Sequence, residues 1–418
     1  TEDLAEQADE TSEGRNLVRR LKSRVRSLLT PPEEPVSPSS ELPPVATQGL
    51  IDSRLQACRL THIAAFTPPG GNAGDILLPA SLQDSVTIRS GGVEWNPVPV
   101  RDAVSQQTIE SVNATQGLII GGGGLFIPDT NSNDFSGCQW PCPVDLLSQL
   151  KVPLCVMAVG YNRFRNQPEF SPVFRQHLEC LVRKSVFIGL RNHGSINALK
   201  QYLPPELHDR LRYHPCLTAV AAQLYPALFS RSVAQPLLAL NCAFDRAALR
   251  YGTDQDRILR AVANAVRTIS EQYSLEVRYY SHYSSDLQMM DYLNSAGVSF
   301  TVDDLTSCTP REIVHAYSRP QVVLGMRGHA QMIPFGCNTP VVSLISHDKL
   351  RWFLDDIGQG SWGVELHETD ADSQIVSATA QILENRTAVV ESIRLSQARL
   401  WQACRQNIDD FLEHVATD

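Results

Sequence analysis

The amino-acid sequence predicts an α/β fold with two Rossmann-like lobes that face each other across a cleft. Three observations lead to this prediction. Apolar segments recur without alternating polar residues, which is typical of parallel strands covered by helices on both faces. Segments with helical periodicity separate these strands along the chain. After Pro226 the alternation of strand and helix begins again, which indicates a second unit of similar size.

The first unit is expected to span residues 48–226. It begins with an apolar strand, a glycine-rich turn and a helix, and a later strand runs into four consecutive glycines. We expect strands at 60–66, 117–127, 152–160 and 185–192, and helices at 75–86, 171–184 and 195–202.

The second unit is expected to span residues 227–371. Its strongest helical pattern covers 254–273, where apolar residues recur at helical spacing. We expect strands at 236–244, 275–282, 298–304, 321–324 and 341–345, and helices at 254–273, 286–296 and 310–318. Residues 372–418 are expected to form C-terminal helices, with the helical pattern at 372–415.

Residues 1–47 are expected to form an extension outside the two lobes. The segment 14–29 has apolar residues at helical spacing and basic residues between them, and the proline-rich segment 30–46 indicates a semi-stiff tether. A basic amphipathic helix can lie on an anionic membrane surface, here the inner face of a membrane. It can equally dock on the protein's own core or on a second copy of the chain in a homo-oligomer, and both interpretations stay open.

The composition limits the class of protein. The 418 residues include 36 Lys and Arg against 45 Asp and Glu, and the net charge of −9 argues against a nucleic-acid binder. We find neither a secretory leader nor an apolar run of the roughly 18 residues that span a membrane, and we expect a cytoplasmic protein. Ten scattered cysteines without a CxxC pair are expected to be reduced and structural, and no metal site is predicted.

Two glycine-rich stretches follow predicted strands. In Gly70–Asp75 the glycines let the backbone approach a ligand, and the following helix N-terminus favours an anion. Asp75 can also cap that helix. In Gly121–Gly124 several backbone N–H groups stand without side chains, which suits an oxyanion or a phosphate. The alternatives are a plain strand-to-helix turn for the first stretch and a close backbone crossing for the second.

Basic side chains follow three other predicted strands. They are Arg191, Arg327 with His329 two residues later, and Lys349. Cations from separate loops are costly to crowd together unless an anion neutralises them. A negatively charged ligand is the simplest explanation, and His329 adds a group that titrates near neutrality. A pairing of Arg191 with a carboxylate at the edge of the cleft is the alternative.

One further pair of polar residues, His282 and Asp286, follows the strand expected at 275–282. Two roles stay open for the pair. The side chains can bind hydroxyl groups of an acceptor, or they can cap a helix.

These segments, in this order, resemble the polysaccharide pyruvyl transferase family. The resemblance spans about 50–360 and is seen in GGNAGD at 70–75, IIGGGGLF at 119–126, the segment Arg191–Ser195, the pair His282 and Asp286, and MRGHAQMIPFG at 326–336 with Lys349. The family is similar in fold to two-lobed GT-B glycosyltransferases. Its activity implies that pyruvyl is transferred from phosphoenolpyruvate to a sugar, which forms a pyruvate ketal and releases phosphate.

The resemblance also implies roles for individual residues. Arg191 and Lys349 match positions that bind the anionic groups of the donor, and His329 matches the acid, so these three are the expected catalytic residues. The expected substrate-binding residues are Asn72, Gly74, Asp75, Gly122, Gly123, Gly124, Asn192, Arg327, His282, Asp286 and His347. No metal and no cofactor are implied, because phosphoenolpyruvate is a substrate.

The chain departs from the family pattern at two places. It has His214-Pro215 where members often have Asp-Pro, and His347-Asp348-Lys349 where members usually have Tyr-Asp-x-Lys. Only Lys349 of the second segment is therefore matched.

Two other functions are compatible with the same fold class. One is a GT-B-type glycosyltransferase that uses a nucleotide sugar, although no acid for ribose hydroxyls is clearly placed in the second unit. The other is a non-catalytic member that binds glycans. The expected partners are phosphoenolpyruvate and a saccharide acceptor, which in its lipid-linked form fits a basic helix on a membrane.

Overall fold

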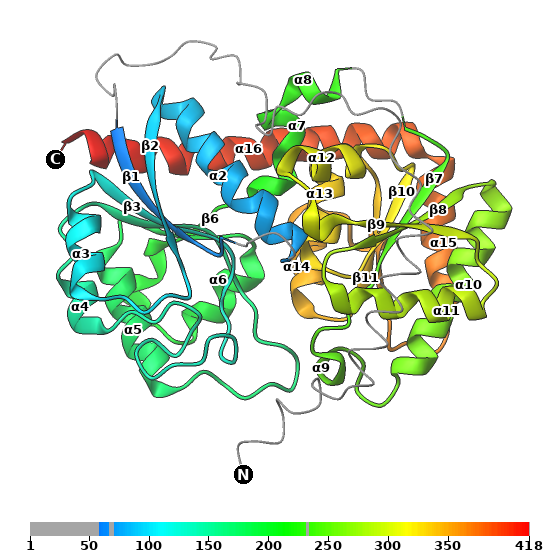
Figure 1. Ribbon diagram of the computed structural model, residues 1–418, viewed down its shortest axis with the longest axis horizontal. Helices are drawn as coiled ribbons and strands as arrows, with labels where there is room; N and C mark the ends of the chain where they lie inside the picture. Colours follow the sequence, from blue (N-terminus) through cyan, green and yellow to red (C-terminus); the bar gives the residue numbers. More distant parts are fainter. Residues whose placement is uncertain (1–57, 67–70, 231–233, 418) are drawn as a thin grey trace.

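The computed structural model describes residues 58–66, 71–230 and 234–417. It confirms the predicted α/β class, because two six-stranded parallel sheets form two lobes that lie side by side (Figure 1). The extension expected at 1–47, with its basic helix at 14–29, lies outside the described residues, as does Gly70.

The sheet of the N-terminal lobe has the strand order β2-β1-β3-β4-β5-β6. Its strands are β1 (Cys58–Ala64), β2 (Val93–Pro99), β3 (Gly117–Phe126), β4 (Leu154–Tyr161), β5 (Ile188–Leu190) and β6 (Leu211–Tyr213). Its helices are α2 (Ala73–Ser90), α3 (Gln106–Asn113), α4 (Val144–Ser148), α5 (Pro172–Lys184), α6 (His193–Lys200), α7 (Ala221–Leu224) and α8 (Pro226–Phe229).

The sheet of the C-terminal lobe has the order β12-β11-β10-β7-β8-β9. Its strands are β7 (Leu237–Asn241), β8 (Glu276–Ser281), β9 (Phe300–Asp304), β10 (Val322–Gly325), β11 (Val341–Ile345) and β12 (Gly363–Glu365). Its helices are α9 (Ala247–Tyr251), α10 (Gln255–Tyr273), α11 (Met289–Ser295), α12 (Pro310–Ser318), α13 (Gly328–Gly336), α14 (Asp348–Asp356) and α15 (Ala371–Glu384).

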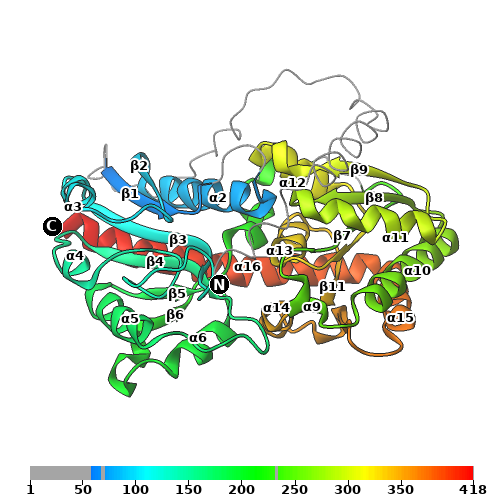
Figure 2. The ribbon, with the colours of Figure 1, turned by 60° about the horizontal axis from the view of Figure 1, so that its bottom comes forward.

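The last helix, α16 (Arg386–Thr417), crosses from the C-terminal lobe to the N-terminal lobe, as both views of the ribbon show (Figures 1 and 2). Two ion pairs fasten its end to the N-terminal lobe, Arg89 to Asp409 at 2.7 Å and Arg212 to Asp410 at 2.6 Å. The helical prediction for 372–415 is thus confirmed, and α16 ties the two lobes together. Among the described helices, none is long and apolar enough to cross a membrane.

All eight interior strands were expected, whereas three edge strands were not. The edge strand β2 mixes polar and apolar residues and holds prolines, and β6 and β12 have only three residues each. Edge strands lack the continuous apolar pattern of strands that are buried on both faces. The helix expected at 286–296 begins later, because Ser284–Gln288 forms a 3-10 turn before α11.

The strand order reverses beside β1 in one lobe and beside β7 in the other. The chain passes from β1 to β2 on one side while β3 lies on the other side, and β7 has the same relation to β8 and β10. Connections that leave neighbouring strands in opposite directions open a crevice at the carboxyl ends of the strands, where ligands of such folds bind. Both crevices open toward the space between the lobes, and both contribute residues to one cavity.

Candidate active site

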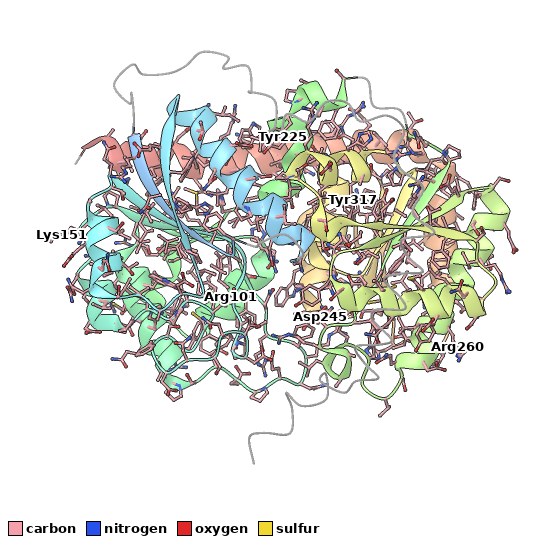
Figure 3. The ribbon with its side chains drawn as sticks, viewed as in Figure 1. Arg101, Lys151, Tyr225, Asp245, Arg260 and Tyr317 are labelled. Atoms are coloured by element: carbon pink, nitrogen blue, oxygen red, sulfur yellow. The ribbon has the colours of Figure 1, made fainter. Side chains whose placement is uncertain are left out.

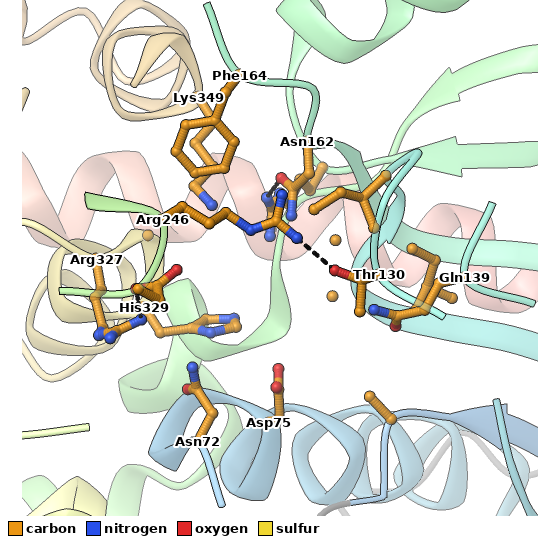
Figure 4. Close-up of a pocket in the computed structure, with 18 of the residues that line it drawn as sticks. Asn72, Asp75, Thr130, Gln139, Asn162, Phe164, Arg246, Arg327, His329 and Lys349 are labelled. Carbon is orange, nitrogen blue, oxygen red and sulfur yellow. Dashed lines mark hydrogen bonds and ion pairs between the residues drawn. The ribbon is translucent and has the colours of Figure 1, made fainter. Parts of the chain in front are cut away.

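A cavity of about 210 Å³ lies between the lobes, at the carboxyl ends of both sheets (Figure 4). The N-terminal lobe contributes loops that follow β1 to β5, and the C-terminal lobe contributes loops that follow β7, β10 and β11. Figure 4 shows Asn72 and Asp75 of α2 on one side of the cavity, with Lys349 and Phe164 on the opposite side. His329 lies between these two sides.

Positive charge dominates the wall of the cavity. Arg101 and Asp245 lie on the facing sides of the two lobes (Figure 3) and line the same cavity. The cationic lining residues are Arg101, Arg191, Arg246, Arg250, Arg327 and Lys349, and the acidic ones are Asp75 and Asp245. Because like charges repel strongly where water is scarce, this wall favours an anionic ligand.

Two of these cations are neutralised by carboxylates of their own lobe. Arg327 pairs with Asp286 through Nε at 2.9 Å and with Asp245 through Nη1 at 2.7 Å. Arg250 pairs with the same Asp245 at 3.1 Å and donates to Ser346 at 3.2 Å. These contacts hold the pKa of Asp245 well below its usual value. Arg327 lines the cavity as expected, but much of its charge is already balanced.

A third cation, Arg246, reaches across the cavity to the other lobe. Its guanidinium donates to Asp129 at 2.7 Å and to Thr130 at 2.6 Å, both in the loop after β3 (Figure 4). Its backbone has a φ of 56°, which is costly for a side chain other than glycine. Strain of this kind clusters at ligand sites, and here it aims the side chain at the opposite lobe.

Within the described ranges 58–66, 71–230 and 234–417, three cavity cations have no carboxylate partner: Arg101, which is exposed, and Arg191 and Lys349, which are not. Arg191 is 4% exposed, donates to the Asn162 amide oxygen at 2.6 Å, and leaves its Nε without a partner. The Lys349 ammonium lies 5.9 Å from the centre of the Phe164 ring. Burial and neighbouring arginines lower the pKa of Lys349 well below its usual value. A buried cation and a half-buried cation, neither with a carboxylate partner, strongly favour an anion between them.

His329 sits in a close-fitting position between α2 and the cationic wall. A Cβ added at Gly74 would lie 1.9 Å from Nδ1 of His329. The imidazole ring therefore packs where a side chain at position 74 would otherwise stand. Its Nε2 lies 3.9 Å from the Cys216 thiol. Burial, together with the charges of Arg191 and Lys349, lowers the pKa of His329 to about 3. The imidazole is therefore neutral at physiological pH while the cavity holds no anion.

The four-glycine stretch belongs to β3 and not to a turn after the strand. Gly122, which was expected beside a ligand, has a φ of 81°, lies against Leu78 of α2 and does not line the cavity. Gly123, with a φ of 99°, and Gly124 do line the cavity. The closest neighbours of Gly121 and Gly122 are leucine side chains of α2, so these two glycines make room for the helix.

Several expected site residues stand behind the cavity wall. Asn192 caps α6 by accepting from the Ser195 N–H at 2.7 Å, and His282 is hydrogen-bonded to Tyr317 at 2.6 Å. Asp286 is fully buried against Arg327, and neither His282 nor Asp286 lines the cavity where an acceptor would bind. The buried pair holds the wall in place instead.

His347 is also buried behind the wall, and its ring lies 4.1 Å from the ring of Phe164. Gly74 packs against His329 and does not line the cavity. The cavity does contain the remaining expected residues: Asn72, Asp75, Gly123, Gly124, Arg191, Arg327, His329 and Lys349. The sequence interpretation missed Arg101, Asn162, Phe164, Asp245, Arg246 and Arg250. A signal for Asn162 existed, because it directly follows the apolar strand β4.

The described residues contain no group of three or more His, Cys, Asp or Glu side chains placed to hold a metal ion. Two parallel sheets whose carboxyl ends enclose a cationic cavity define a GT-B-like protein suited to an anionic ligand. The chain belongs to the polysaccharide pyruvyl transferase family, whose model matches residues 72–348. Its role accordingly lies in pyruvyl transfer during glycan biosynthesis.

Several solved structures are similar to this chain over most of its length. A Listeria monocytogenes protein described as a putative UDP-N-acetylglucosamine 2-epimerase is 13% identical, with 81% of this chain and 91% of that chain covered and a TM-score of 0.50. The S. aureus MnaA–UDP structure is 12% identical, with 80% and 90% covered and a TM-score of 0.49. The UDP-GlcNAc 2-epimerase from Methanocaldococcus jannaschii is 13% identical, with 78% and 93% covered and a TM-score of 0.48. No curated protein matches the chain in sequence.

Proposed function

We propose that this protein transfers the pyruvyl unit of phosphoenolpyruvate to a sugar of a glycan or lipid-linked saccharide, with formation of a pyruvate ketal and release of phosphate. The observation that supports this most is the convergence of Arg191 and Lys349, from different lobes, on one cavity without a neutralising carboxylate among the described residues. Phosphoenolpyruvate is small and has a phosphate and a carboxylate, so it offers one anionic group to each cation.

The proposed reaction begins with proton transfer from the His329 imidazolium to the methylene carbon of the donor. The central carbon becomes electrophilic, and an acceptor hydroxyl oxygen bonds to it while its proton passes to a base. The carbon–oxygen bond to phosphate then breaks, and phosphate leaves with the bonding electrons. A second hydroxyl of the same sugar bonds to that carbon, loses its proton and closes the ketal.

Asp75 is the residue to which we assign the role of base. Its carboxylate lines the cavity on the side opposite Lys349, where an acceptor hydroxyl can approach the donor (Figure 4). Burial raises the pKa of Asp75, and this is opposed by the charges of Arg101 and other cations. Asn72 beside it accepts from the Gly74 N–H at 2.8 Å and shapes the start of α2.

Binding of the donor is expected to protonate His329. Its pKa of about 3 reflects burial and two neighbouring cations, so the dianionic phosphate will raise that pKa toward and above neutrality. Calorimetry at pH 7 in buffers of different ionisation enthalpy should therefore show net proton uptake on phosphoenolpyruvate binding. His329→Gln should reduce that uptake, and an unchanged uptake would contradict protonation of this ring.

A single methyl group at Gly74 is expected to impair turnover. Gly74→Ala places a Cβ 1.9 Å from the His329 Nδ1, so the ring must leave its position. Because misplacement of a catalytic group is costly, kcat should fall on the order of tenfold. Alanine is the better helix former, so α2 itself should not lose stability. Steady-state kinetics measure kcat, and thermal melting measures stability. Full turnover in Gly74→Ala would show that catalysis does not require the position of the His329 ring against Gly74.

Phosphate release tests the proposed function directly. Purified protein is incubated with phosphoenolpyruvate and a panel of saccharide acceptors, while phosphate is measured and products are weighed by mass spectrometry. The expected result is acceptor-dependent phosphate release with addition of one pyruvate, less one water, to the saccharide. Thermal shifts with phosphoenolpyruvate and with nucleotide sugars are measured in parallel. Stabilisation by nucleotide sugars alone would overturn the proposal in favour of a glycosyltransferase.

A further inference from the structure

Asn162 lies directly after β4 and contacts both the loop that contains Arg191 and the loop that contains Lys349. Its side-chain oxygen accepts from Nη2 of Arg191 at 2.6 Å, which is the only hydrogen bond of that guanidinium within the described part of the chain. Its backbone oxygen accepts from Nε2 of His347 at 3.4 Å, two residues before Lys349. One residue of the N-terminal lobe therefore touches both loops that present the poorly compensated cations.

Two glycines make this arrangement possible. A Cβ at Gly124 would lie 1.5 Å from the Asn162 side-chain nitrogen, so the amide occupies the space where a side chain would stand. A Cβ at Gly160 would lie 2.3 Å from Nε of Arg191. The Asn162 amide therefore packs against the backbone of Gly124, and the Arg191 guanidinium packs against the backbone of Gly160. This packing limits how far the two groups can rotate away from each other.

The chemical nature of the partner also matters. An amide oxygen orients a guanidinium without neutralising it, whereas a carboxylate would form a bidentate pair and cancel the charge. Arg327, in the same cavity, has two carboxylate partners, while Arg191 has an amide alone within the described ranges. Arg191 therefore keeps both its fixed direction and its full charge for a ligand.

We propose that Asn162 is a positioning residue that aims the Arg191 guanidinium at the anionic donor, and that Gly124 is required because it admits the Asn162 amide. The inference rests on the proposed function in one respect, namely that Arg191 binds phosphoenolpyruvate. It assigns the last glycine of the four-glycine stretch a task that differs from a phosphate cradle of N–H groups.

A double-mutant cycle tests the inference with full-length protein and phosphoenolpyruvate as the probe. Asn162→Ala frees the guanidinium, and Gly124→Ala displaces the amide that holds it. Each single variant should weaken phosphoenolpyruvate binding by about tenfold, the usual cost of one hydrogen bond to a charged group. In the double variant the clash is relieved and the amide is already gone, so its affinity should equal that of Asn162→Ala. KM for the donor should rise more than kcat falls.

Asn162→Asp gives a second, nearly isosteric test that does not depend on the clash. The new carboxylate would pair with Arg191 and compete with the donor, so affinity should fall further than in Asn162→Ala, with thermal stability retained or increased. If Asn162 had only a structural role, the nearly isosteric Asn162→Asp variant should bind phosphoenolpyruvate more tightly than Asn162→Ala. Gly360→Ala is the matched glycine control, because Gly360 has no atom within 4 Å of an added Cβ, and it should bind normally.

The outcomes separate this inference from the proposed function. If wild-type protein does not bind phosphoenolpyruvate, the proposed function fails. If the wild-type protein binds phosphoenolpyruvate, and both Asn162→Ala and Asn162→Asp bind it as tightly as the wild type does, the positioning role of Asn162 is overturned. Additive effects of Gly124→Ala and Asn162→Ala would overturn the assigned role of Gly124. Equal affinities of Asn162→Ala and the double variant, together with a weaker Asn162→Asp, support the inference.

Discussion

His329→Gln is expected to lower kcat for phosphate release from phosphoenolpyruvate by about 10²- to 10⁴-fold, the usual contribution of a general acid. Glutamine keeps a polar side chain between Gly74 and the cationic wall but cannot deliver a proton to carbon. Under the proposed function Arg191 and Lys349 bind the donor, so KM for the donor should change little. Stopped assays for phosphate, with acceptor present, measure both constants.

The pH dependence distinguishes an acid from a structural role for His329. In the wild type, kcat should fall as pH rises above the raised pKa of the imidazolium in the donor complex. The residual activity of His329→Gln should lose that descending limb. His315→Gln is the control, because His315 lies on α12 and does not line the cavity. Turnover in His329→Gln within a few-fold of the wild type would remove His329 from the chemistry.

The residues that could be predicted from sequence are those that directly follow apolar strands. Arg191, His329 and Lys349 come after β5, β10 and β11, and parallel strands bring their carboxyl ends to one edge of a sheet. Their meeting in one cavity then requires only that the two sheets face each other. The fold class was predictable for the same reason, because buried parallel strands leave continuous apolar segments.

The residues that escaped prediction depend on contacts between distant segments. Arg246 acquires its role from Asp129 and Thr130, more than a hundred residues earlier in the chain, and its neighbourhood has no recognisable pattern. Asn162 is defined by its contact with Arg191 and by the space at Gly124. The role of Arg246 comes from the packing of the two lobes, and that of Asn162 from contacts between loops of the N-terminal lobe. The place of Asn162 after β4 was a signal in the sequence, but its contacts were not.

The glycine stretch shows why a correct motif can be interpreted wrongly. Consecutive glycines are typical of turns, yet here β3 continues through them because helix α2 packs directly on the backbone. Leu78 occupies the side of Gly122, and Leu82 occupies the side of Gly121. A helix that packs closely on a strand requires glycine in that strand, just as a ligand that approaches the backbone closely does. Sequence alone does not distinguish the two demands.

Asp286→Ala is expected to destabilise the protein by about 3 kcal/mol, at the lower end of the usual cost of breaking a buried ion pair. Asp286 is fully buried and accepts from Arg327, from the His282 N–H at 3.1 Å and from Asn241 at 3.4 Å. The substitution leaves these donors with one acceptor fewer. Asp245 still pairs with Arg327, which limits the loss. Urea-induced unfolding measures the free energy of unfolding.

The same substitution should affect donor binding in the opposite direction. Without Asp286 the charge of Arg327 is less neutralised, so the cavity becomes more positive and phosphoenolpyruvate should bind at least as tightly as before. A ligand that binds the native state stabilises it, so saturating phosphoenolpyruvate should restore part of the lost stability. Asp303→Ala is the control, since Asp303 forms a partly exposed pair with Arg278 and should cost less than about 1 kcal/mol. Equal losses in the two variants would show that Asp286 is not the buried support of the cationic wall.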